Sequence, residues 1–146
     1  MKEKILVALK SFEKVAAEIT DETNKARQEL ESWIDNPEIN NVGCIDSKTK
    51  KGSKNPPGGV VFLKSEGYLE RFVSSRAEAR VTEGILMAHE NCLYMRVILN
   101  ADTLSSQQKI ISQTENALKK LNYQYHTNFQ IFKEKQGSAT PYMKRG

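Results

Sequence analysis

The chain has 146 residues, of which 38% are hydrophobic and 27% are charged, and its formal net charge is +4. This composition excludes a disordered chain, and no run of about 18 apolar residues is long enough to span a membrane. We therefore expect one soluble domain, residues 1–146, that buries a hydrophobic core. Because two cysteines make no disulfide framework and no signal sequence begins the chain, we expect reduced thiols in the cytoplasm.

The segment 2–36 carries a repeat that predicts a long amphipathic helix, ending before Pro37. Apolar or small side chains recur in alternating steps of four and three residues at Ile5, Leu9, Phe12, Ala16, Ile19, Thr23, Ala26, Leu30 and Trp33. A repeat of about 3.5 residues is typical of a helix that packs along another helix. The alternative is that this seam covers a sheet within one chain.

The charges of this segment favour a second copy of the chain as the partner. Four lysines make its first half basic, whereas acidic residues dominate its second half. This order opposes the helix macrodipole, and an antiparallel copy would place the basic half against the acidic half. We therefore predict a homo-oligomer with antiparallel N-terminal helices. The predicted interface residues are Ile5, Leu9, Phe12, Ala16, Ile19, Leu30 and Trp33.

Beyond the helix, alternating patterns predict an antiparallel sheet of about five strands joined by short turns. The segments that we assign to strands are 39–45, 60–64, 68–74, 76–88, 92–100 and 123–132. One stretch stays open, because residues 66–81 also fit a helical stripe.

A second helix is predicted at residues 105–121, where Ser105 and Gln108 form a capping-box pattern before a run with helical periodicity. Residues 133–146 are expected to form a flexible tail. The predicted fold class is therefore α+β, with helices layered on an antiparallel sheet.

Four side chains are soft enough to bind zinc, namely Cys44, His89, Cys92 and His126. The His89-x-x-Cys92 pair would lie across a hairpin turn, and the other two residues would have to converge on it. Neither of them belongs to a paired motif, so we predict no metal site and no cofactor. No catalytic residue is assigned, because Cys44 has no local base and no glycine-rich phosphate loop precedes a helix.

The basic residues are the best candidates for a binding site. A loop at residues 46–59 is rich in turn formers, and loops of this length are usually functional or mobile. With nearby predicted strands it supplies cations and one aromatic ring: Lys48, Lys50, Lys51, Lys54, Arg76, Arg80, Arg96 and Tyr94. These groups would suit a phosphate-bearing ligand. The more common alternative is that a lysine-rich loop is only solvated.

Together these features predict a small oligomeric binding protein for an anionic ligand, either a nucleotide or a nucleic acid. The alternative is a protein-interaction module, such as an inhibitor or assembly factor, whose first helix engages a different protein. An enzyme whose catalytic groups meet only in the fold ranks third. No membrane partner is expected.

Overall fold

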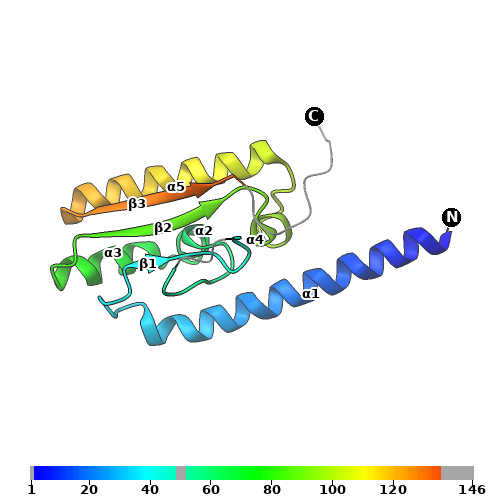
Figure 1. Cartoon of the computed structure of the whole chain (residues 1–146), viewed down its shortest axis with the longest axis horizontal. Helices are drawn as coiled ribbons and strands as arrows, with labels where there is room; N and C mark the ends of the chain where they lie inside the picture. The colour runs from blue at the N-terminus through cyan, green and yellow to red at the C-terminus, as the bar shows by residue number, and fades with distance from the viewer. Residues whose placement is uncertain (1, 49–51, 136–146) are drawn as a thin grey trace.

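The computed structural model describes residues 2–48 and 52–135, with the side chains of residues 13–48 and 52–135. Five helices and three strands occur in these residues (Figure 1). In chain order they are α1 (Lys2–Trp33), β1 (Asn41–Val42), α2 (Val60–Ser65), α3 (Leu69–Glu78), β2 (Glu83–His89), α4 (Leu93–Val97), α5 (Leu104–Tyr125) and β3 (Asn128–Glu134). The mixed α and β composition expected from the sequence is therefore correct.

The three strands form one parallel sheet in the order β1-β2-β3. Ile85 of β2 pairs with Asn41 of β1 and with Gln130 of β3, so β2 is the central strand. Parallel neighbours need a crossover rather than a hairpin, and the two crossovers contain α2 with α3 and then α4 with α5. All three strands consequently end at the same edge of the sheet, which we call the carboxyl edge.

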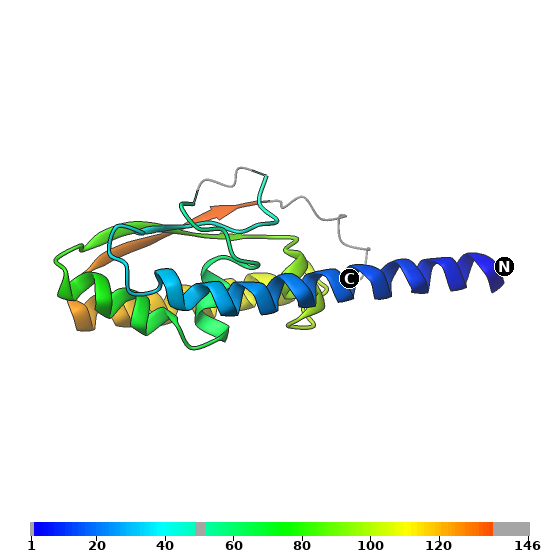
Figure 2. The ribbon, with the colours of Figure 1, turned by 90° about the horizontal axis from the view of Figure 1, so that it is seen from below.

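Helices cover one face of this sheet and leave the other face open (Figure 2). Phe72 of α3 meets Phe129 of β3 edge to face, with ring centroids 5.5 Å apart, and Leu86 of β2 lies in the same core. On the opposite face Ile85 and Phe132 are 50% and 46% exposed. Helices thus cover one side only within the part of the chain that the structure describes, and on the other side Ile85 is exposed whereas Met87, closer to the end of β2, is buried.

The predicted antiparallel sheet of about five strands is wrong. The segments 60–64 and 68–74, which we assigned to a hairpin, form helices α2 and α3, and the segment 92–100 contains α4. Four consecutive side chains of α2, from Val60 to Leu63, are buried. Since this helix is covered on every side, its sequence lacks the helical stripe, and periodicity cannot distinguish such a segment from a buried strand.

The element bounds also differ from the prediction. β1 occupies only part of the segment 39–45, β2 begins later than the segment 76–88 and ends one residue beyond it, at His89, and β3 begins at Asn128, later than the predicted segment 123–132. The reason is that α5 continues to Tyr125 and ends at His126 in the left-handed conformation. Two residues of the predicted tail belong to β3, and residues 136–146 lie outside the described chain.

The C-terminal part of α1 packs on the rest of the chain. Ile19, Leu30 and Trp33 of the predicted seam are buried there, and Ala16 is partly buried. The seam therefore covers the chain's own core at these positions, which makes the three buried residues unavailable to another copy. The N-terminal part of α1 extends past the other elements (Figures 1 and 2), and the side chains of Ile5, Leu9 and Phe12 lie outside those described.

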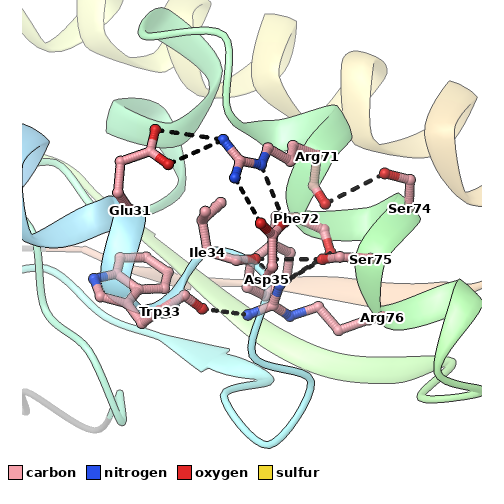
Figure 3. Close-up of polar contacts among 9 residues, drawn as sticks. All are labelled: Glu31, Trp33, Ile34, Asp35, Arg71, Phe72, Ser74, Ser75 and Arg76. Carbon is pink, nitrogen blue, oxygen red and sulfur yellow. Dashed lines mark hydrogen bonds and ion pairs between the residues drawn. The ribbon is translucent and has the colours of Figure 1, made fainter.

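A buried arginine of α3 holds the C-terminal end of α1 (Figure 3). The guanidinium of Arg76 donates to the carbonyl oxygens of Trp33, Ile34, Asn36 and Ile39, with an Nη2–O distance of 2.9 Å to Asn36. The last carbonyls of a helix have no hydrogen-bond donors within the helix, and the Arg76 guanidinium supplies such donors. Burial lowers the pKa of Arg76 to about 10.

Next to it, Arg71 connects α3 to the same end of α1 from the surface (Figure 3). Its Nε and Nη2 atoms donate to the two carboxylate oxygens of Asp35 at 3.0 and 2.6 Å, and Nη1 lies 3.3 Å from Glu31. The hydrogen bond from Arg71 lowers the pKa of Asp35. These contacts join α1 to α3 within one chain.

Among the described residues, no helix has the length and apolar character that a membrane crossing requires.

Candidate metal centre

Three potential metal ligands from separate segments meet at the carboxyl edge of the sheet. Cys44 follows β1 by two residues, His89 is the last residue of β2, and Cys92 is the N-cap of α4. The two Sγ atoms and a ring nitrogen of His89 all lie within 4.8 Å of one another. The side chains are 0%, 1% and 1% exposed, respectively. Adjacent parallel strands end side by side, which is why residues far apart in sequence meet here.

The Cys44 sulfur accepts hydrogen bonds from two backbone groups. The N–H of Gly58 lies 3.1 Å from Sγ, and the N–H of Asp46 lies 3.4 Å from it. Gly58 has φ 85°, and a Cβ atom there would lie 2.4 Å from the Tyr94 ring, so this position requires glycine. The loop that leaves the sheet at Cys44 therefore returns to the same sulfur.

Cys92 is held through its backbone by a buried glutamine of α5. The Cys92 N–H donates to Oε1 of Gln107 at 2.9 Å, and Nε2 of Gln107 donates to the Cys92 carbonyl at 3.2 Å. Between His89 and Cys92 the chain turns through Asn91, which has φ 56°. The turn and the glutamine together set the position of the second sulfur.

The imidazole of His89 has one satisfied nitrogen and one unsatisfied nitrogen. Nδ1 lies 2.9 Å from the Glu90 carbonyl oxygen, which can only accept, so Nδ1 carries a proton. In the neutral ring Nε2 then presents a lone pair. This atom is buried and has no hydrogen-bond partner among the described residues. A histidine that donates one N–H to a carbonyl and leaves the other nitrogen bare is prepared for metal binding.

The pKa values of the two thiols are shifted in opposite directions. Burial would raise the pKa of Cys44, but contacts with Cys92 and His89 and the Asp46 N–H outweigh burial and lower it to about 5. Burial and the neighbouring Cys44 sulfur raise the pKa of Cys92 well above its ordinary value. Burial would lower the pKa of His89, yet contact with the Cys44 sulfur and its charge raises it. Without a metal, the cluster therefore concentrates negative charge on Cys44.

A cation and a substrate make different demands on this cluster. A cysteine beside a histidine is also the arrangement of a thiol nucleophile. A nucleophile has to meet its substrate, however, and the Cys44 side chain is completely buried. A metal ion is held by the ligand side chains themselves, so a buried sulfur suits it. The geometry therefore fits metal binding better than covalent catalysis.

The lysines of the predicted anion site lie in different places. Lys48 is exposed at the carboxyl edge, where Arg96 also lies, on α4. Lys54 runs beside β1, where its carbonyl accepts from the Gly43 N–H at 2.8 Å. Lys50 and Lys51 lie outside the described residues. These cations are not gathered into one pocket in the described part of the chain.

The other residues of that predicted site are farther away or buried. Arg80 is exposed just before β2, at the opposite edge, and the seven residues of β2 span about 20 Å. Arg76 and Tyr94 are buried, and the Tyr94 hydroxyl lies 2.7 Å from Oγ of Ser65. Arg76 cannot reach a surface ligand, because its guanidinium bonds to carbonyls inside the core. The anionic ligand stays a prediction.

Cys44, His89 and Cys92 are three of the four soft side chains that the sequence offers as zinc ligands, and the structure brings these three together. The fourth, His126, lies just before β3, at the opposite edge. The predicted antiparallel hairpins do not place Cys44 near His89. In the parallel sheet Cys44 follows β1 and His89 ends β2, so both lie at one edge.

Comparison with known proteins adds no further constraint. No family model, curated protein or solved structure matches the chain.

Proposed function

We propose that this protein binds a zinc ion through Cys44, His89 and Cys92. The observation that supports the proposal is the meeting of two sulfurs with an unpartnered, buried imidazole nitrogen. Zinc bonds to sulfur are about 2.3 Å and bonds to nitrogen about 2.0–2.1 Å, so ligands of one ion lie roughly 3.5–4 Å apart. The separations of up to 4.8 Å therefore need only a small contraction.

The ligand chemistry selects the ion. Two thiolates and an imidazole favour zinc and other soft or borderline metals over magnesium and calcium, which prefer oxygen. Zinc would also replace the proton that keeps Cys92 neutral, because a metal-bound cysteine is deprotonated.

The ion would join three segments that meet at the carboxyl edge. Cys44 begins the loop that returns at Gly58, His89 ends β2, and Cys92 begins α4. An ion that binds only the folded chain stabilises it by about 4 kcal/mol when free zinc exceeds the dissociation constant about 1,000-fold. The proposed role of the ion is to stabilise the carboxyl edge of the sheet.

The test is the metal content and stability of the purified protein. We expect about one zinc per chain by plasma mass spectrometry after purification under reducing conditions. A chelator should lower the melting temperature, and added zinc should restore it. His89→Ala should lose the ion, whereas His126→Ala, at the opposite edge, should keep it.

Two results would contradict the proposal. One is a wild-type chain that binds no zinc even after refolding in its presence. The other is a His89→Ala variant that retains the wild-type stoichiometry and affinity. A different soft metal, such as copper(I), at the same stoichiometry would keep the site and change the ion.

A further inference from the structure

The open face of the sheet lacks the second layer of helices that parallel sheets normally have. Parallel sheets are almost always covered on both faces. Here Ile85 and Phe132, on adjacent strands, are 50% and 46% exposed on the face without helices (Figure 2). Large apolar side chains that are exposed together mark a surface for association.

A channel runs along β2 on this face. It consists of two cavities, of about 340 and 240 Å³, that share Asn41 and Ile85 as lining residues. Glu83 and several amide side chains line the larger cavity at the amino edge of the sheet, whereas Met87 and Phe132 line the smaller one, closer to the carboxyl edge. No lysine or arginine is among the described residues that line either cavity. The channel is therefore acidic at the amino edge and apolar toward the carboxyl edge.

The N-terminal part of α1, residues 2–14, has complementary features. Figure 1 shows it projecting beyond the carboxyl edge, and Figure 2 shows it in the layer of the helices. Ile5, Leu9 and Phe12 recur at helical spacing, so they share one side of the helix. Four lysines and two glutamates give these residues a net charge of +2, opposite in sign to that of the channel. The same chain thus supplies both a basic amphipathic helix and an acidic, partly apolar sheet face.

The dimensions of the helix segment and of the sheet face also agree. As a helix, residues 2–14 are about 20 Å long, and the seven residues of β2 also span about 20 Å. Three strands about 4.8 Å apart form a face that is about as wide as one helix with its side chains. One such helix segment therefore covers the open face from end to end.

We propose that the N-terminal part of α1 of each chain docks in the channel of a second copy of the chain, which forms a two-fold symmetric dimer. The helix of the other copy is then the missing layer of the sheet. A two-fold axis at the carboxyl edge carries the tip of that helix toward the amino edge. Lys2 and Lys4 of one copy therefore approach Glu83 of the other, and Phe12 approaches Phe132. This inference does not depend on zinc binding.

Reciprocal docking supplies the area that a stable dimer needs. A helix segment about 20 Å long and about 12 Å wide covers roughly 240 Å² on each partner, so two contacts bury roughly 1,000 Å² in total. This value reaches the lower end of the range for specific interfaces. A single contact gives only about half of it, which is why the dimer has to use both.

Ile85→Lys tests the receiving surface. Ile85 is half exposed in the single chain, so a lysine there can stay solvated, whereas in the dimer it would lie under a basic helix. We expect the dissociation constant of the dimer, measured by analytical ultracentrifugation, to rise more than about 30-fold while the circular dichroism spectrum stays unchanged. Phe132→Lys should act in the same way, and it decides the question if Ile85→Lys fails to fold. Tyr123→Lys, on α5 and 88% exposed, is the matched control and should keep the wild-type constant.

Crosslinking of mixed isotope-labelled and unlabelled chains locates the contact. A carbodiimide joins a lysine amine directly to a carboxylate, so dimers of mixed label should contain a link from Lys2 or Lys4 to Glu83. Links between the two α1 helices instead, with a wild-type dissociation constant in both sheet variants, would overturn the inference in favour of a helix pair. An equal loss in Tyr123→Lys would also overturn it, because added charge anywhere would then explain the effect. A wild-type chain that stays monomeric at high micromolar concentration would refute the dimer itself and leave the zinc site unaffected.

Discussion

Arg76 shows how much one buried side chain can determine in a chain of this size. It has no exposed surface, and its guanidinium lies 3.8 Å above the Phe72 ring while it donates to carbonyls after α1. Within the described part of the chain, its hydrogen-bond partners include no carboxylate. The cost of burying this charge is therefore offset by oriented carbonyl groups and the aromatic face.

Replacing Arg76 by methionine should destabilise the fold strongly. The substitution keeps apolar volume but removes every hydrogen bond that the guanidinium donates to the carbonyls of Trp33, Asn36 and Ile39, so we expect a loss of about 3 kcal/mol or more. Urea unfolding followed by circular dichroism measures this loss. Arg80→Met, at an exposed position, should change the free energy of unfolding by less than about 0.5 kcal/mol. Equal changes in the free energy of unfolding for the two variants would show that the hydrogen bonds of Arg76 contribute no more to stability than an exposed arginine does.

At the scale of elements, α1 has two parts with different environments. From Ile19 to Trp33 one face of the helix is buried, and Arg27 reaches Glu66 with Nε–O and Nη2–O distances of 2.9 and 2.8 Å. Val15 is 37% exposed, near the point where the helix leaves the body. The second half of the repeat thus packs against the rest of the same chain.

Substitutions along α1 should reveal this division. Leu30→Ala removes a fully buried side chain and should cost about 2–5 kcal/mol, independent of protein concentration, because the contact lies within one chain. Val15→Ala should cost much less. Both values come from thermal or urea unfolding at two protein concentrations. A Leu30→Ala effect that disappears on dilution would mean that Leu30 contacts another chain.

At the scale of the whole molecule, the projecting N-terminal part of α1 is where self-association stays a prediction (Figure 1). Ile5, Leu9 and Phe12 continue the seam in the sequence, whereas Leu30 and Trp33 are covered by the chain itself. An interface between copies that is formed by this seam would therefore use the first half of the helix.

Phe12→Asp tests that interface. A charge in an apolar contact between chains should dissociate the oligomer and leave the monomer folded, because the buried half of α1 is untouched. Light scattering gives the mass, and circular dichroism shows whether the helices and strands persist. Lys14→Gln, close by on the helix, serves as a control that should keep the mass. A wild-type protein that is monomeric at micromolar concentration would exclude self-association.

The two long helices can be predicted from the sequence, because their signals are local. The steps of four and three along residues 2–36 and the helical periodicity between residues 105 and 121 involve neighbours on one helix face. Helix α1 ends at Trp33, slightly before the predicted end at residue 36. Helix α5, Leu104–Tyr125, extends slightly beyond the predicted range 105–121 at both ends. A short buried helix such as α2 has no polar face, so the same method assigned it to a strand.

Only the tertiary structure decided the direction of the strands and the meeting of Cys44 with His89 and Cys92. Strand direction depends on how α2 to α5 cross the sheet, and this is a matter of packing between segments far apart in the sequence. Once β1 and β2 run in parallel, their ends bring the first cysteine to the histidine. The ligand types are visible in the sequence, but their convergence is a property of the fold, because a metal site requires positions in space and not along the chain.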